Sequence, residues 1–91
     1  MPSVNYTVEL PDGKQRQCYS PSTIIHDYFK SGESMSMNEF VSRSRKALNA
    51  ASERVRERFG FACSSAMDQL GEIENWGSSY PAEGTIRILK I

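Results

Sequence analysis

The 91-residue sequence lacks an excess of charge of either sign, and it lacks long hydrophobic runs. Its 11 Lys and Arg residues balance 11 Asp and Glu residues, whereas a general nucleic-acid binder needs surplus positive charge to displace counterions from phosphates. No apolar run approaches the ~20 residues that a membrane span requires. The first residues have neither the basic nor the apolar segment of a signal peptide, so we expect a cytoplasmic protein without a membrane partner.

The sequence is also poor in metal ligands, with two cysteines and one histidine. In the cytoplasm, Cys18 and Cys63 should be reduced thiols rather than a disulfide. Neither a Cys-x-x-Cys nor a His-x-x-x-His spacing occurs, so we expect no metal site. A glycine-rich phosphate loop and the Gly-x-Ser-x-Gly elbow of hydrolases are absent too, and no cofactor is expected.

Alternation of β-branched and aromatic residues with polar ones predicts a strand over residues 4–10. Pro11-Asp12-Gly13 is typical of a turn, because proline presets its own φ and glycine supplies a positive φ. Residues 14–19 should return antiparallel as a solvated edge strand. The strongly apolar residues 85–91 form a third predicted strand, which we expect beside residues 4–10 since a lone hairpin is rarely stable.

The longest predicted helix covers residues 36–59. Ser36 and Glu39 have the spacing of a capping box, and Gly60 is the expected left-handed residue after the last turn. Apolar and small residues at steps of three and four draw one face along about six turns of this helix. They are Phe40, Val41, Ser44, Leu48, Ala51, Val55 and Phe59.

Two shorter helices are predicted on either side of it. Ser20 and Pro21 are typical of a helix start, and the apolar residues that follow indicate a helix over residues 21–29, with a polar connector over residues 31–36. The other short helix covers residues 64–76. Its predicted inner face consists of Ala66, Met67, Leu70, Ile73 and Trp76.

These elements together predict one α+β domain over residues 1–91. A small antiparallel three-stranded sheet, made of the N-terminal hairpin and the C-terminal strand, packs against two to three helices in the order ββαααβ. A chain of this length buries only about 60–65% of the surface that it exposes when unfolded, so association with another subunit would stabilise it.

Cys63, Cys18 and His26 are the candidate catalytic residues. A thiol beside the histidine would supply the nucleophile and base of a cysteine hydrolase or transferase. Cys63 precedes a predicted helix, whose dipole would lower the pKa of the thiol. Cysteine is also among the residues most often buried, and a structural role explains both thiols without chemistry. We therefore leave an enzymatic activity open and favour a non-enzymatic role.

Two sets of residues are candidates for binding an anion or a partner. The first set lies at predicted helix starts, where converging backbone amides would bind an anion. It consists of Ser20, Ser64 and Ser65. The second set is basic and would suit an acidic partner or an RNA backbone. It consists of Arg43, Arg45 and Lys46, together with Arg54, Arg56 and Arg58 further along the same predicted helix. We prefer a solvated helix face for the second set, since charges of both signs are normal along a helix.

Several stretches share the pattern of one protein family. They are residues 18–25 (Cys-Tyr-Ser-Pro-Ser-Thr-Ile-Ile), 39–41, 43–45, 47–48, 51–56 (Ala-Ser-Glu-Arg-Val-Arg), 59–61, 63–64, 69–70 and 73–74. Over almost its whole length the sequence resembles the small nitrogen starvation response proteins. The resemblance implies a bacterial cytosolic accessory protein, encoded beside a nitrilase, a radical-SAM protein, an acetyltransferase and a flavoprotein in nitrile- or cyanide-assimilation clusters. It assigns no catalytic residue.

From the residues and the resemblance together we expect an accessory protein of nitrogen metabolism. It would contact a protein of its own pathway, or a second copy of itself as a homodimer. Two alternatives stay open at this point. One is a small enzyme or ligand-binding subunit that uses Cys63, Cys18 and His26, and the other is an RNA-binding module that uses the arginine-rich helix.

Overall fold

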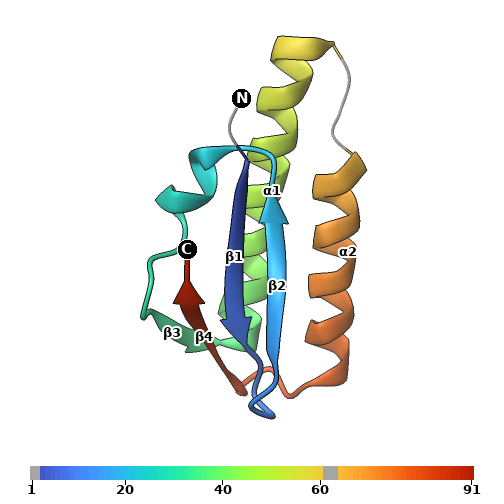
Figure 1. Ribbon diagram of the computed structural model, residues 1–91. Helices are drawn as coiled ribbons and strands as arrows, with labels where there is room; N and C mark the ends of the chain where they lie inside the picture. Colours follow the sequence, from blue (N-terminus) through green and yellow to red (C-terminus); the bar gives the residue numbers. More distant parts are fainter. Residues whose placement is uncertain (1–2, 61–63) are drawn as a thin grey trace.

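The structure, a computed structural model, describes residues 3–60 and 64–91. Within these ranges it has four strands, two α-helices and one 3-10 helix, with principal dimensions of 38 × 23 × 17 Å. The elements follow one another along the chain as shown in Figure 1. They are β1 (Val4–Glu9), β2 (Gln15–Ser20), the 3-10 helix η1 (Thr23–Asp27), β3 (Ser34–Ser36), α1 (Met37–Phe59), α2 (Ser64–Ser79) and β4 (Thr85–Lys90).

The strands form one antiparallel sheet in the order β2-β1-β4-β3. The predicted position of the C-terminal strand beside the first strand is confirmed, since Val8 faces Ile88 and Glu9 faces Arg87 across β1 and β4. The predicted hairpin of β1 and β2 is confirmed too, and Gly13 in its turn has a φ of 89°. The sheet therefore places the first and last strands of the chain at its centre.

The prediction of three strands is one too few. The sequence pattern predicts a polar connector over residues 31–36, whereas Ser34–Ser36 forms strand β3 at the sheet edge beside β4. Main-chain hydrogen bonds guide the chain into this strand. The Gly32 N–H donates to the Ile88 carbonyl and the Ile88 N–H donates to the Glu33 carbonyl, each at 2.7 Å. Three residues are too few to display a period of two, so only the partner strand identifies β3.

The prediction of an α-helix over residues 21–29 is wrong. This stretch contains only η1, a 3-10 helix of five residues. Ser20 belongs to β2, and the N-cap is Ser22, whose Oγ accepts a hydrogen bond from the Ile24 N–H. The segment carries the chain from β2 at one sheet edge to β3 at the other, about 14 Å away at ~4.8 Å per strand. The Ile25 carbonyl accepts from both the Tyr28 and the Phe29 N–H groups (3.1 Å each), which closes η1 after a single turn.

Helix α1 begins and ends where the sequence predicts. The Ser36 Oγ accepts a hydrogen bond from the Glu39 N–H (3.1 Å), as the capping box requires. Gly60 follows the last helical residue with a φ of 83°, and its N–H donates to the Arg56 carbonyl (2.8 Å). A residue with a side chain would be strained at that φ, so Gly60 defines the helix end.

The N-terminal end of α1 is also joined to the turn that precedes β4. The Met37 N–H donates to the Gly84 carbonyl (2.7 Å), and the Asn38 N–H donates to the Ala82 carbonyl (3.0 Å). With the serine cap, these bonds occupy the amides that would otherwise attract an anion. They also fix the start of the helix to the C-terminal strand.

The core lies between the sheet and the two α-helices, which pack on the same face of the sheet (Figure 1). Phe29 is at its centre, with its ring centroid 6.2 Å from that of Tyr6 and 5.4 Å from that of Phe40. Each of these three rings is at most 1% exposed. The other large, fully buried hydrophobic side chains are Ile25, Met37, Leu48, Ile73, Ile86, Ile88 and Val8.

The two α-helices pack closely at one position. A Cβ atom added to Gly77 of α2 would lie 2.9 Å from the Val41 Cγ2 atom of α1, so this contact requires glycine. One turn further along, the Arg45 Nε atom lies 2.9 Å from the Glu74 Oε2 atom. Helix α2 continues through Gly77 to Ser79, beyond the predicted end at residue 76, because the glycine serves the helix contact and does not end the helix.

Two predicted core positions near the junction of the helices are wrong. Met67, assigned by its spacing to the inner face of α2, is 37% exposed, because the buried face runs along Ala66, Leu70 and Ile73. Phe59, the last member of the α1 stripe, is 53% exposed. Burial in α1 stops at Ser52, and the remaining two turns extend past the sheet and α2 in Figure 1.

Candidate functional site

Cys18 lies inside the protein rather than at an accessible site. Its side chain is 2% exposed and faces Tyr6 across the β1–β2 ladder. Burial raises the pKa of the thiol to about 12, and the nearby Glu72 carboxylate acts in the same direction, while the Tyr6 hydroxyl opposes them. Burial also raises the pKa of Tyr6. The thiolate form needed for nucleophilic attack is therefore strongly disfavoured at Cys18.

His26 does not share the environment of Cys18. The histidine is exposed on η1, whereas the thiol faces the core. Cys63, the third candidate, lies outside the described residues. Among the residues that are described, no three His, Cys, Asp or Glu side chains gather in a group suited to a metal ion. Of the helices in those same ranges, none has both the length and the hydrophobicity needed to cross a membrane.

Ser20 closes a turn at the end of β2. Its Oγ donates to the Ser22 carbonyl (2.8 Å) and accepts from the Ser22 N–H (3.3 Å). Both serines are almost completely buried. These contacts give Ser20 a structural role and leave its hydroxyl no access to a ligand in solution.

Ser64 and Ser65 are exposed at the start of α2, and Ser65 borders a surface hollow of about 340 Å³. The other residues around this hollow are Tyr19, Asp68, Gln69 and Glu72. Its two carboxylates oppose the binding of an anion. The Gln69 Oε1 accepts a hydrogen bond from the Tyr19 N–H (3.0 Å), so α2 also covers part of the outer edge of β2. The structure does not bring Ser20 and Ser65 together at one accessible surface, since Ser20 is buried and Ser65 lies beside acidic residues.

Arg43 joins α1 to the chain between η1 and β3. Its Nη1 atom lies 2.8 Å from the Glu33 Oε2 atom, and its Nε atom lies 2.8 Å from the Glu39 Oε1 atom. Nη1 also donates to the Tyr28 carbonyl (3.3 Å). The hydrogen bond from Arg43 holds the pKa of Glu33 below its ordinary value. The guanidinium is therefore engaged within the fold.

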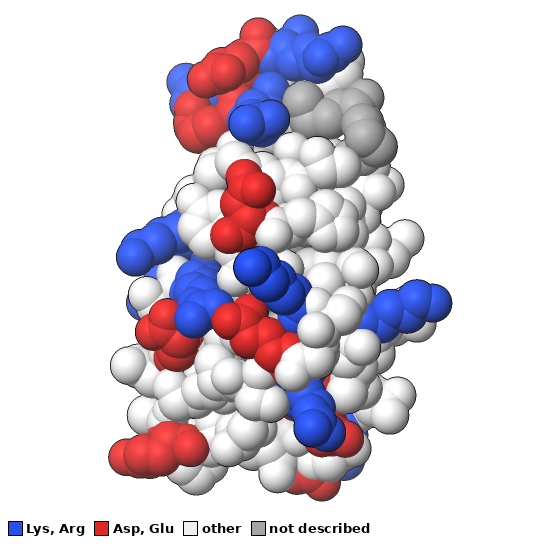
Figure 2. Space-filling model, turned by 90° about the vertical axis from the view of Figure 1, so that its left-hand side faces the viewer, with Lys and Arg blue, Asp and Glu red and all other residues white. Residues whose placement is uncertain are grey.

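Arg45 and Lys46, which follow Arg43 in the basic set, differ from each other. Arg45 is paired with Glu74, whereas Lys46 is exposed on α1. Figure 2 shows positive and negative side chains intermingled over this side of the molecule, including the end of α1. Arg43, Arg45 and Lys46 thus form no continuous positive surface.

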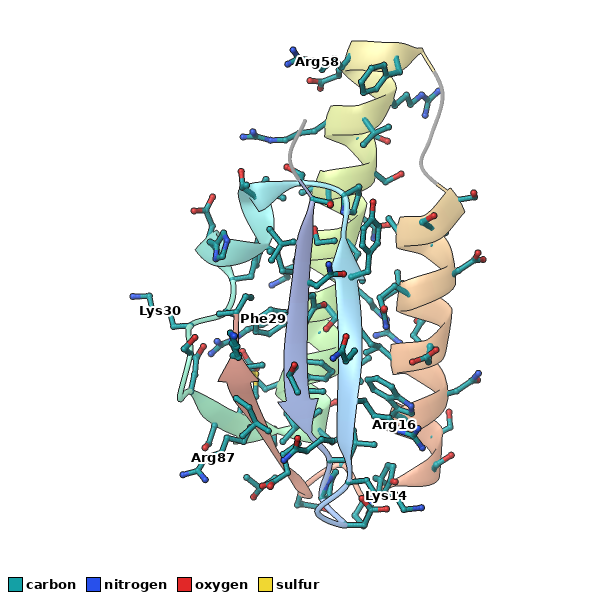
Figure 3. The ribbon with its side chains drawn as sticks, in the orientation of Figure 1. Lys14, Arg16, Phe29, Lys30, Arg58 and Arg87 are labelled. Atoms are coloured by element: carbon teal, nitrogen blue, oxygen red, sulfur yellow. The ribbon has the colours of Figure 1, made fainter. Side chains whose placement is uncertain are left out.

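The structure exposes two hydrophobic residues that the sequence pattern places in the core, and they lie beside the last three arginines of the predicted basic set. Phe59 and Met67 are the two exposed large hydrophobic residues of the described chain, and they lie at the end where α1 finishes and α2 begins. Arg54, Arg56 and Arg58 surround Phe59 on the same two turns and are exposed. Figure 3 shows Arg58 at the tip of α1, away from the strands. We call residues 53–59 the α1 tip.

The exposure of the α1 tip could have been inferred from the sequence in one way, by comparing the length of α1 with the lengths of the elements beside it. Helix α1 has 23 residues and α2 has 16, while the three longer strands have six residues each. At ~1.5 Å per helical residue, α1 is about 35 Å long, whereas a six-residue strand covers only about 20 Å. No neighbouring element is long enough to cover the whole apolar stripe.

A search of curated proteins and a search of solved structures find no match to this chain. A family model does match, and it covers residues 5–91. The match includes all four strands except the first residue of β1, and both α-helices. It confirms the resemblance to nitrogen starvation proteins, and the chain belongs to the family described as nitrogen starvation-induced protein NitG.

Proposed function

We propose that this protein acts during nitrogen starvation as a small cytoplasmic binding protein that contacts another protein through the α1 tip. The observation that supports this most directly is Phe59, which is 53% exposed at the end of a continuous helix. A large aromatic side chain on a regular helix offers contact area at a low cost in conformational entropy, and such residues often contribute most to binding energy. Half-buried Val55, one turn earlier, extends the same apolar surface.

The rest of the protein supports a binding role over a chemical one. Cys18 is buried with a raised pKa, and Arg43 and Arg45 are held in ion pairs within the fold. The family resemblance to proteins of nitrile- or cyanide-assimilation clusters suggests where the partner is encoded. We infer that the partner is one of the proteins encoded in the same cluster.

Co-expression tests this proposal. The tagged chain is expressed with each protein encoded beside it, and captured proteins are identified by mass spectrometry. We expect one neighbour to be retained by the natural chain and at least tenfold less by Phe59→Ser. Lys46→Ser is the matched control, because Lys46 is also exposed on α1 but lies outside the tip. Equal retention by Phe59→Ser, or a monomer in sedimentation that retains no neighbour, would contradict the proposal.

A further inference from the structure

We propose that the surface that receives the α1 tip is an apolar depression bordered by carboxylates. This inference rests on the proposed function, and it adds the chemistry of the partner.

The positive charges flank the apolar line of the tip. At ~100° per residue, Arg56 and Arg58 fall on opposite sides of the line from Val55 to Phe59. Glu57 falls on the reverse of the helix by the same rotation. A partner that covers Phe59 therefore meets guanidinium groups on both sides of the ring.

These guanidinium groups are only weakly engaged within the chain. Arg56 has one distant contact, 3.7 Å from the Glu53 Oε1 atom, and both side chains are about two-thirds exposed (65% and 64%). Within residues 3–60 and 64–91, Arg54 and Arg58 have no carboxylate oxygen within salt-bridge distance. An exposed pair of this kind contributes little to stability, so both charges stay available to a partner.

The same pattern disfavours a second copy as the occupant. When two helices pair antiparallel about a two-fold axis, each flank of one helix faces the same flank of the other. With the two-fold axis at the level of residue 57, Arg58 would face Arg58 of the second copy, and Arg56 would face Arg56. Like charges in contact oppose association, whereas carboxylates at these positions would favour it.

Nucleic acid also fits the α1 tip less well than an acidic protein surface does. The chain has no net charge, and Glu53 and Glu57 lie on the same two turns as the arginines. Phosphate binding gains most from surplus positive charge, which this chain lacks. The combination of Phe59 with two flanking arginines instead matches an acidic rim around an apolar centre.

The test uses two synthetic helical peptides that share a leucine stripe, flanked by glutamates in one and by lysines in the other. Binding of each labelled peptide to the full chain is followed by fluorescence anisotropy at low and moderate salt. We expect the glutamate peptide to bind at least tenfold more tightly, with the difference shrinking as salt increases. Arg56→Glu/Arg58→Glu should reverse the preference, and the milder Arg56→Gln/Arg58→Gln should abolish it.

Lys46→Glu is the matched control, since it changes a charge of the same sign on α1 outside the tip and should leave the preference intact. Equal binding of both peptides, an unchanged preference in the arginine variants, or a preference for an RNA homopolymer would overturn the inference. The two proposals fail separately. Loss of the peptide preference with Phe59-dependent capture intact removes only the acidic rim, whereas loss of capture with the preference intact removes the proposed function.

Discussion

Helix α1 has two parts that look alike in sequence and differ in the structure. The first part, from Met37 to Ser52, buries its apolar face, and the arginines that it contains are paired with glutamates of neighbouring segments. The α1 tip continues the same apolar spacing and is also rich in arginine, yet it exposes Phe59 and, among the described residues, has no ion pair to another element. Whether an apolar residue or an arginine of α1 serves the core or the surface thus depends on whether another element packs against it.

The comparison teaches that an amphipathic pattern identifies a face of a helix but not the length over which that face is covered. The stripe from Phe40 to Phe59 is continuous in sequence. Its cover ends where the strands and α2 end. The four predictions below test this division, from the largest expected effect to the smallest.

Truncation of a phenylalanine in each part should give the largest contrast. Phe40 is completely buried, so Phe40→Ala should lower the free energy of unfolding by about 3–5 kcal/mol. Phe59→Ala should lower it by less than about 0.5 kcal/mol, because more than half of that side chain is already in water. Urea unfolding followed by circular dichroism measures both values. Similar losses for the two variants would show that the division of α1 is wrong.

Two glycines of α2 test how closely the first part of α1 is packed. A Cβ at Gly77 would lie 2.9 Å from the Val41 Cγ2 atom, so Gly77→Ala should destabilise the fold by about 1–2 kcal/mol despite the better helix propensity of alanine. A Cβ at Gly71 would meet no atom within 4 Å, and Gly71→Ala should stabilise the fold by up to about 1 kcal/mol. Thermal melts compare the two. Equal shifts in the same direction would argue against the close helix contact.

The ion pairs of Arg43 should make the first part of α1 sensitive to pH. Because Arg43 holds the pKa of Glu33 below its ordinary value of 4.5, the pair stabilises the fold above that pH, and the contribution is lost as the pH falls through the lowered pKa. Arg43→Gln should cost about 0.5–1 kcal/mol at pH 7, since these side chains are about one-third exposed. Unfolding at pH 7 and at pH 3 tests it. The cost of the substitution should shrink at pH 3, and a constant cost would reject the assigned role.

The smallest effect is expected at Arg54. This residue is exposed on the α1 tip, so Arg54→Gln should change the free energy of unfolding by less than about 0.5 kcal/mol at either pH. The measurement is the same pair of denaturation curves used for Arg43→Gln. A pH-dependent loss at Arg54 would mean that the tip is engaged within the fold after all.

Much of the fold follows from local residue patterns. The capping box at Ser36 and the glycine at residue 60 predict both ends of α1, and the Pro11-Asp12-Gly13 turn predicts the hairpin. Local patterns could not predict β3, because three residues have no period and this strand exists through its pairing with β4. They also misassigned η1, since its form depends on the path across the sheet from β2 to β3.

The candidate site was harder to predict than the fold. Residue type suggested Cys18 and Ser20, but burial and a closed turn explain both. Arg43 and Arg45 were chosen for their charge, and partners distant in the chain neutralise them. Of the α1 tip, the sequence pattern places Val55 and Phe59 in the core, because a repeating stripe gives no information on which neighbours are present.

Helix α1 is bonded to the rest of the fold at its N-terminal end and projects from it at its C-terminal end. The amides of Met37 and Asn38 are bound to the turn before β4, while about 10 Å of helix at the other end has no support from the sheet or α2. A sideways load at Phe59 is carried by the packed part of α1 from Met37 to Ser52, whose first residues are bonded to residues 82–84. There a Cβ at Gly84 would lie only 2.9 Å from the Pro11 ring of the hairpin turn. One continuous helix thus joins a partner bound at the tip to the turn that packs against the hairpin at the opposite end of the molecule.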